Sequence, residues 1–171
     1  MSNTGTPTRR AELAQFDAWP PELQTWFDGQ LLASKAGFTA SFVTCQEGGR
    51  LGTSLLGIGE LYAPGPRSLR FALWARARAT RSLATSPRAA LTFVFGDAFY
   101  QIQLDVKPFA SAEAQASGLA CFEATIVSGE LQRAPYARLD AGISFTLDEE
   151  LREATLSRWG RQLEWLMAAG E

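Results

Sequence analysis

Residues 68–82 read Ser-Leu-Arg-Phe-Ala-Leu-Trp-Ala-Arg-Ala-Arg-Ala-Thr-Arg-Ser, an apolar, strand-like segment that turns into a short, alanine-rich polar one. The run lies within a longer stretch, Leu61 to Gly96, which holds six arginines and no acidic residue, although the formal net charge of the chain is -2. A strand that leads into a helix start brings free backbone N–H groups and guanidinium donors together, which favours a phosphate site. A solvated basic face is the alternative interpretation.

The composition bounds the class of protein. A chain of 171 residues has a common size for one domain and can bury a core without disulfides. Cys45 and Cys121 match no metal-ligand spacing and are typical of small buried side chains in a reducing compartment. The absence of histidine excludes Ser-His-Asp and Cys-His catalysis and an imidazole base. We therefore expect no metal site and nominate no catalytic side chain.

The hydropathy and charge of the chain bear on its cellular location and on its partners. No apolar run approaches the length of a bilayer span, and residues 1–10 contain no hydrophobic signal core. We therefore expect a cytoplasmic protein with no membrane partner. A pI of about 5.3 argues against non-specific nucleic-acid binding, so we expect no nucleic-acid partner.

The sequence of the N-terminal half predicts a helix followed by a β-hairpin. Residues 1–17 are polar and are expected to form a loose leader, followed by a single domain over residues 18–171. Prolines and an acid at 20–22 predict a helix start, and the apolar period continues until Gly37. Two β-type runs around a Gly-Gly turn at 48–49 then predict a hairpin, with strands over 38–45 and 51–62.

The remaining elements follow the same signals. We expect a strand over 69–75, a short helix over 77–85 that ends before Pro87, and a second hairpin over 89–95 and 98–109. Residues 111–131 are ambiguous. Leu119, Phe122, Ile126 and Val127 fit a helix, whereas Thr125 to Val127 and Gly129 favour a strand; we predict the helix. A last strand over 141–147 and a terminal helix over 148–169 complete the chain.

Together these elements predict a mainly β fold, a six-stranded antiparallel split β-barrel with N-terminal, short connecting and C-terminal helices. From about Phe38 to Phe109 the order of parts resembles the pyridoxamine 5'-phosphate oxidase-like family, the FMN-binding split barrels. The resemblance rests on Leu69-Arg-Phe-Ala-Leu-Trp, the arginine-bearing short helix, and Ser86-Pro87-Arg88-Ala-Ala-Leu-Thr-Phe. It implies FMN as the cofactor and a homodimer with the flavin at the subunit interface.

The resemblance also implies a set of flavin-binding positions. Arg78 corresponds to a phosphate-binding arginine, and Arg76 and Arg81 lie close enough in sequence to assist it. The other positions come from the second strand, the third strand and the second hairpin: Ser54, Leu55, Leu56, Gly57, Ala72, Leu73, Trp74 and Gln101. For Trp74 the competing interpretation is an ordinary packing aromatic, and for Gln101 it is a solvent-facing strand position.

Three departures from the family pattern bear on the reaction. Ser54, Gly59 and Ala79 stand where the oxidase itself carries cations, and the chain has no histidine to bind a substrate phosphate. We therefore do not expect oxidation of vitamin B6 phosphates. The resemblance implies an FMN-dependent oxidoreductase in which the flavin does the redox chemistry. A split barrel that uses a deazaflavin or haem, and a non-catalytic flavin-binding module, are the alternatives.

Overall fold

The computed structural model describes residues 11–168. The strands are β1 Glu12–Phe16, β2 Thr39–Cys45, β3 Leu51–Gly57, β4 Leu61–Gly65, β5 Ser68–Trp74, β6 Arg88–Phe95, β7 Ala98–Phe109 and β8 Leu119–Arg133. The helices are α1 Pro21–Trp26, α2 Leu32–Lys35, the 3-10 turn η1 Ile58–Glu60, α3 Arg78–Thr85, α4 Ala112–Ala116 and α5 Glu149–Ala168.

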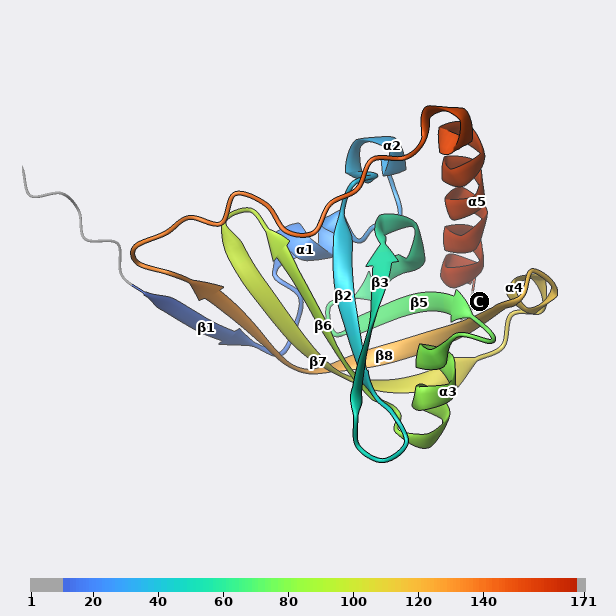
Figure 1. Ribbon diagram of the computed structural model, residues 1–171, viewed down its shortest axis with the longest axis horizontal. Helices are drawn as coiled ribbons and strands as arrows, with labels where there is room; N and C mark the ends of the chain where they lie inside the picture. Colours follow the sequence, from blue (N-terminus) through green and yellow to red (C-terminus); the bar gives the residue numbers. More distant parts are fainter. Residues whose placement is uncertain (1–10, 169–171) are drawn as a thin grey trace, which may run out of the picture.

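The strands form one antiparallel sheet in the order β3-β2-β6-β7-β8-β5-β4, with β1 added to the side of β8. The sheet curls into an open half-barrel, with α5 against one side and α3 below it (Figure 1). The expected fold class, mainly β with an antiparallel split barrel and helices outside it, is confirmed. The sheet has eight strands within the described residues rather than six.

The segment 111–131 departs most from expectation, since only its start is helical. Ser111 Oγ caps α4 by accepting from Ala114 N at 3.3 Å, and the helix then ends at Gly118, whose φ is 78°. The predicted helix over the rest was wrong, because β8 pairs with β7 on one side and with β5 on the other. A strand with two paired neighbours buries alternate residues, and its apolar positions matched the helical period by coincidence.

The strand expected over 51–62 ends at Gly57, where η1 begins, and three further boundaries differ. Residues 12–16, expected within the loose leader, pair with β8 as β1; residues 1–10 lie outside the described part. The single helix expected up to Gly37 is two short helices, because the chain turns at Gly29, whose φ is 76°. Residues 141–147 form no strand and make one bridge, Phe38 to Ser144, since both edges of β2 already pair with β3 and β6.

The barrel interior is filled by large apolar side chains from its strands. The rings of Phe42 and Phe71 lie 4.9 Å apart at their centroids, and Phe71 stacks on Phe122 at 5.3 Å. Leu91 and Ile102 are fully buried in the same core. None of the described helices is both long and apolar enough to cross a membrane.

Helix α5 covers the outer face of β5 and β8 and is fixed there by Arg70. The guanidinium donates from Nε to Glu123 Oε2 at 2.9 Å and from Nη1 to the Leu166 carbonyl at 2.9 Å. The hydrogen bond from Arg70 to Glu123 lowers the pKa of the Glu123 carboxyl, although the partial burial of this carboxyl acts in the opposite direction. One arginine of the basic stretch is thus committed to joining the terminal helix to the sheet.

We predict opposite effects for two glycine substitutions around Trp159. A Cβ at Gly59 would collide with the buried Trp159 ring, so Gly59→Ala should lower the free energy of unfolding by about 1–3 kcal/mol. Gly160, in α5, has no heavy atom within 4 Å of an added Cβ, so Gly160→Ala should raise it by about 0.5–1 kcal/mol. Urea denaturation measures both, and a shift of the same sign in the two variants would contradict the packing of α5 on η1.

Candidate functional site

The site predicted from the arginine stretch lies where α3 crosses the end of strand β3. β3 is a terminal strand of the sheet, so its outer edge carries backbone groups with no strand partner among residues 11–168. Helix α3 packs against β2, β3 and β5. Arg78 Nη2 donates to the Thr53 carbonyl on this edge at 3.3 Å. The side chain of Arg78 therefore links the start of α3 to the open edge.

The first turn of α3 presents backbone N–H groups to the surface. Ala77 is the N-cap residue, and no described side chain caps the helix. The N–H groups of the first helical residues have no partner inside a helix, and the helix dipole makes this end electropositive. Thr80 Oγ1 donates to the Trp74 carbonyl at 2.7 Å, which holds the turn between β5 and the helix. This geometry suits an anion.

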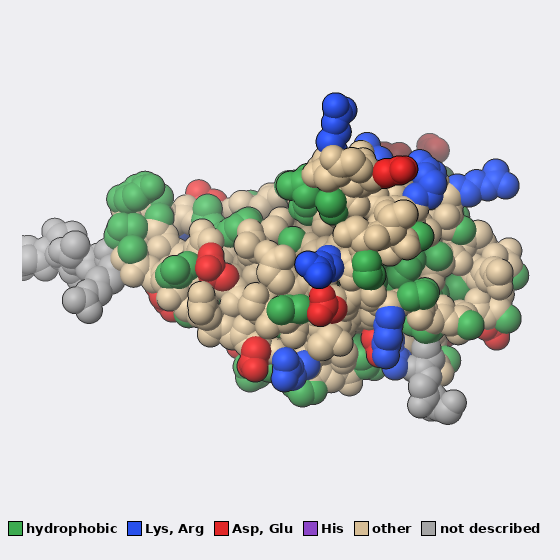
Figure 2. Space-filling model, turned by 90° about the horizontal axis from the view of Figure 1, so that it is seen from below, with side chains coloured by type: hydrophobic (Ala, Val, Ile, Leu, Met, Phe, Trp, Pro, Cys, Tyr) green, Lys and Arg blue, Asp and Glu red, His purple; other side chains and the backbone are tan. Residues whose placement is uncertain are grey.

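Three exposed arginines surround that helix start: Arg76, Arg78 and Arg81. Arg81 Nη1 donates to the Arg76 carbonyl at 2.7 Å, so the two residues are neighbours in space. Within the described part of the chain, none of the three forms an ion pair with a carboxylate. From below, Lys and Arg side chains project separately, with acidic side chains beside some of them (Figure 2). The basic character is confined to this helix start, and its three guanidinium groups are accessible to a ligand.

The strand positions predicted to touch a flavin are divided between two faces of the sheet. Leu55 faces outward and is 56% exposed, whereas Leu56 and Gly57 are buried. Ser54 is half-buried and lies opposite the core residue Phe42. Of these four predicted positions, Leu55 alone thus has an exposed side chain.

Gln101 lies in the same outward row as Leu55. The row runs from Leu55 through Ser41 and Thr92 to Gln101 by successive cross-strand pairs. Three strand spacings correspond to roughly 14 Å, so one subunit does not bring Gln101 next to Leu55. Gln103 and Asp105, on the same face further along β7, are exposed, so a solvent-facing role for Gln101 stays open.

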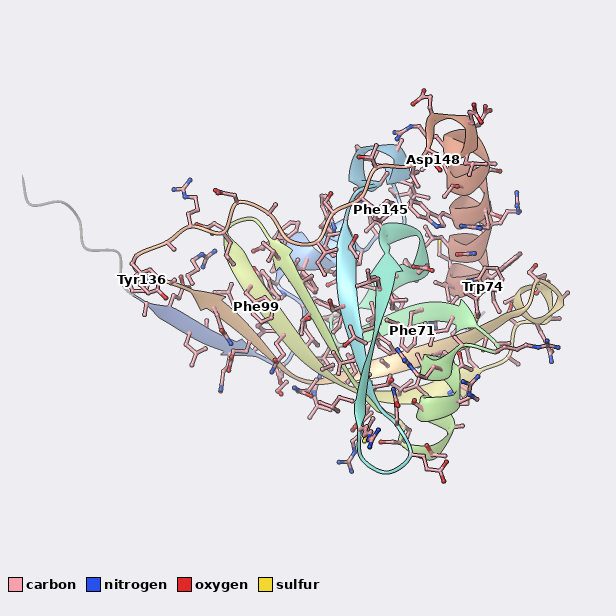
Figure 3. All side chains as sticks on the ribbon, in the orientation of Figure 1. Phe71, Trp74, Phe99, Tyr136, Phe145 and Asp148 are labelled. Atoms are coloured by element: carbon pink, nitrogen blue, oxygen red, sulfur yellow. The ribbon has the colours of Figure 1, made fainter. Side chains whose placement is uncertain are left out.

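The third-strand positions are similarly split. Ala72 is buried beneath α5 against Leu163 and Leu166, and Leu73 faces the barrel interior. Trp74 is 55% exposed at the end of β5, beside Gly118 (Figure 3). Of these three residues, Trp74 alone has a side chain that a surface ligand can reach.

Gly52 belongs to the site but was not predicted. A Cβ there would lie 3.3 Å from Arg78 Nε and would also meet the side chain of Gln46. A glycine at this place lets the guanidinium lie close against the strand. The sequence signal was the glycine itself, since glycine inside a strand often marks a close approach.

Comparison with known proteins places the fold. No protein-family model matches the sequence. The chain is 28% identical over 140 residues to the uncharacterised protein YclD of Bacillus subtilis, covering 80% of this chain and 88% of that protein. It superposes on a candidate pyridoxamine 5'-phosphate oxidase of Lactobacillus delbrueckii with a TM-score of 0.50, 9% identity and coverage of 67% and 94% of the two chains. The fold is that of the pyridoxamine 5'-phosphate oxidase-like split barrels.

A second structure with the same arrangement is HupZ of Group A Streptococcus, with a TM-score of 0.51, 8% identity and coverage of 66% of this chain and 98% of that one. At such identities the likeness concerns the split-barrel fold alone. The ligand that this split barrel takes therefore depends on its own side chains. Among residues 11–168, no group of three or more His, Cys, Asp or Glu side chains could hold a metal ion.

The structure explains two of the missing cations. Gly59 lies directly under the Trp159 ring, and Ala79 is 1% exposed in α3, so neither place has room for a lysine or arginine. Ser54 is half-buried on the inward row of β3. The arginines at 76, 78 and 81 are the cations available to an anionic ligand at this split barrel's helix start.

Glu60, at the end of η1, contacts Gly57, one of the predicted flavin-binding positions. Glu60 Oε2 accepts a hydrogen bond from Gly57 N at 2.6 Å. Burial raises the pKa of the Glu60 carboxyl above its usual 4.5, although the Gly57 hydrogen bond and Arg158 act in the opposite direction. A raised pKa in the folded state means that the folded protein holds this proton more tightly than the unfolded chain. Its contribution to stability is therefore lost as the pH rises above about 4.5.

We predict that Glu60→Gln removes this pH dependence. The amide oxygen can still accept from Gly57 N, but it carries no charge to desolvate. The free energy of unfolding of the variant relative to the native protein should increase as the pH rises above about 4.5. Urea titrations at several pH values measure the difference, with the exposed Glu150→Gln as the control variant. A difference that stays constant would show that the pKa of Glu60 is not raised in the folded protein. A difference that falls with rising pH would show that this pKa is lowered.

Proposed function

We propose that this chain binds FMN, with the phosphate at the start of α3, and acts as a flavin-dependent oxidoreductase. The observation that carries the proposal is the uncapped N-terminus of α3 surrounded by three exposed arginines that have no carboxylate partner among the described residues. The split-barrel fold supports the same site. The resemblance to the FMN-binding split barrels predicted a flavin at these positions.

The phosphate chemistry follows from the donors. Arg78, the first residue of α3, reaches the Thr53 carbonyl of β3, and Arg81 donates to the Arg76 carbonyl just before the helix. Guanidinium groups bind phosphate oxygens through paired, charge-assisted hydrogen bonds, and backbone N–H groups at a helix start add further donors. Weak existing contacts, such as the 3.3 Å bond from Arg78 to Thr53, can be exchanged for stronger ones to an anion.

The remaining flavin contacts use the exposed apolar side chains. Leu55 and Trp74 offer surfaces for the ring system or the ribityl chain. When bound, the flavin supplies the redox chemistry, and this chain contributes binding, orientation and exclusion of water. Cys45 and Cys121 are both free thiols, which is consistent with the proposed cytoplasmic location.

The absorption spectrum of the purified protein distinguishes the cofactors. An oxidised-flavin spectrum, either as isolated or after FMN is added to the protein, supports the proposal. A deazaflavin spectrum or a haem band assigns the split barrel to another cofactor. If the protein binds neither FMN, nor a deazaflavin, nor haem, the proposal that it binds a cofactor is contradicted.

Arg78 provides the residue-level test. Arg78→Ala should weaken FMN binding by on the order of 2 kcal/mol, because charge-assisted hydrogen bonds to the phosphate are lost. Riboflavin lacks the phosphate, so its weaker binding should hardly change. Arg78→Lys should give an intermediate loss, since it keeps the charge but not the fork. Fluorescence titration of each flavin measures the three proteins.

Arg67→Ala is the matched control, because Arg67 is an exposed arginine of the same stretch near the start of β5, away from α3. It should leave FMN binding unchanged. Equal losses for FMN and riboflavin in Arg78→Ala would show that Arg78 only supports the fold. No loss for either flavin would move the phosphate away from Arg78.

We further propose that the protein is a homodimer with the flavin at the interface. Leu51 and Leu55 on β3 and Trp74 on β5 are 73%, 56% and 55% exposed, and a second copy could cover this apolar surface and the open edge of β3. A second copy on the outer face would also bring its own Gln101 toward the site. Such a dimer explains why one subunit leaves Gln101 apart from the arginines.

We predict that light scattering of the FMN-loaded protein gives twice the 18.6 kDa mass of one chain. Leu55→Glu should shift the protein toward monomer and weaken FMN binding, because it places a charge on the apolar surface. Leu13→Glu, on β1 and 65% exposed, is the control and should change neither property. A stable monomer that retains FMN would contradict the shared site.

A further inference from the structure

A cavity of about 450 Å³ lies at the start of β2, away from the arginine site. Phe38 and Thr39 line it, whereas Arg78 contacts the Thr53 carbonyl opposite Val43, near the other end of β2. Its walls come from α1 and α2, from the turn between β6 and β7, and from residues 140–144, which run over the sheet between Tyr136 and Phe145 (Figure 3). Four separate parts of the chain thus meet around one space.

Aromatic rings form much of the wall. Trp26 packs edge-on against Phe38 and Phe95, with ring centroids 5.9 and 5.1 Å apart and interplanar angles of 66° and 63°. Val94 and Ile143 add aliphatic surface. A wall of this kind favours a flat or aromatic ligand through packing and through apolar burial.

Trp26 also has an unsatisfied polar atom. Its Nε1 is buried and donates to no acceptor among the described residues. The other buried indole of this region, Trp19, donates from Nε1 to the Ser68 carbonyl at 2.9 Å. A buried N–H without a partner costs free energy, and native structures seldom keep one without a reason. An acceptor that comes from outside the chain would satisfy it.

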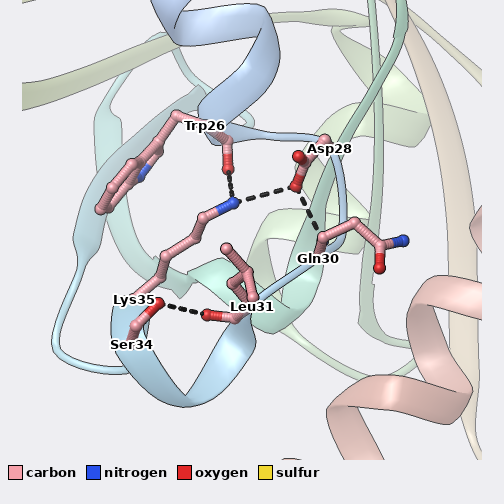
Figure 4. Close-up of polar contacts among 6 residues, drawn as sticks. All are labelled: Trp26, Asp28, Gln30, Leu31, Ser34 and Lys35. Carbon is pink, nitrogen blue, oxygen red and sulfur yellow. Dashed lines mark hydrogen bonds and ion pairs between the residues drawn. The ribbon is translucent and has the colours of Figure 1, made fainter.

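Lys35 lines the cavity, and an ion pair compensates its positive charge. Its ammonium, 8% exposed, donates to the Trp26 carbonyl at 3.0 Å and to Asp28 Oδ1 at 2.9 Å, as Figure 4 shows. Nζ also lies 5.3 Å from the centroid of the Trp26 ring. Asp28 compensates the lysine charge, and Asp140 adds a negative charge to the lining. These charges disfavour an anion, and the apolar side chains of the wall favour an uncharged ligand.

The roof over the cavity is lightly attached. Residues 140–144 are exposed and join the sheet through the single bridge between Phe38 and Ser144. Ile143 is 54% exposed in this segment. Exposed segments of this kind open more readily than core strands, and such an opening is the route by which we expect a ligand to reach the indole N–H.

We infer that this cavity binds a small, uncharged aromatic molecule that carries a carbonyl oxygen, and that the oxygen accepts a hydrogen bond from Trp26 Nε1. The aromatic wall holds the ring, and the indole supplies the single directional contact. The inference does not depend on the flavin site, since no residue of the cavity wall belongs to that site.

Two probe molecules of nearly equal shape test it. Acetophenone has a ring and a carbonyl oxygen, whereas α-methylstyrene replaces the oxygen with a CH2 group. Ligand-observed NMR titrations should show acetophenone binding about three- to tenfold more tightly, the range expected of one hydrogen bond. Trp26→Phe keeps a ring but removes the N–H, so the ratio should fall to about one while α-methylstyrene still binds.

Trp19→Phe is the matched control, because it removes an indole N–H that already has an acceptor. It should leave the probe ratio unchanged, whereas Trp26→Phe should bring the ratio to about one. Arg78→Ala should leave the probe ratio unchanged. The cavity inference can therefore hold even if the flavin proposal fails. Absence of acetophenone binding up to its solubility limit, or an unchanged ratio in Trp26→Phe, would overturn the inference.

Discussion

The structure depends on a barrel that cannot close. The two end strands of the sheet, β3 and β4, follow each other in the chain and are joined by the three residues of η1, yet they form no ladder with each other. The opening between them must be covered by other elements, since exposed strand edges and apolar interiors are unfavourable in water. Helix α5 packs against η1 and β4, and α3 lies against β3 and β5. The position of both helices is a consequence of the split.

The same opening divides the arginines of one stretch into two roles. Arg70 points to the side of the sheet that α5 covers, where Glu123 and the Leu166 carbonyl satisfy it. A charge so enclosed requires partners, because its desolvation is otherwise unfavourable. Arg76, Arg78 and Arg81 follow the end of β5 and lie at an exposed helix start. A difference of a few residues along the chain thus separates a structural cation from cations that can bind a ligand.

Local signals in the sequence predicted much of this arrangement. The Gly-Gly turn at 48–49 and the Gly96-Asp97 turn placed both hairpins, and Pro87 placed the end of α3. The failures were at elements that depend on distant partners: β1 and β8 pair across more than a hundred residues. The exposed arginines could be predicted because a helix start is local. The burial of Ala72 could not, because it requires knowing that α5 folds back over β5.

Helix α5 also accounts for the way the site departs from the family pattern. Trp159 seals the opening by lying over Gly59, so a side chain at residue 59 would have to displace the helix that covers the split. A cation at this position and the present packing of α5 are therefore mutually exclusive. The positive charge at the site has to come from elsewhere, and the exposed first turn of α3 is a place where arginines disturb no packing. The sealing of the barrel and the anion site that we propose thus belong to different elements, and Arg78 links the start of α3 to the open edge of β3.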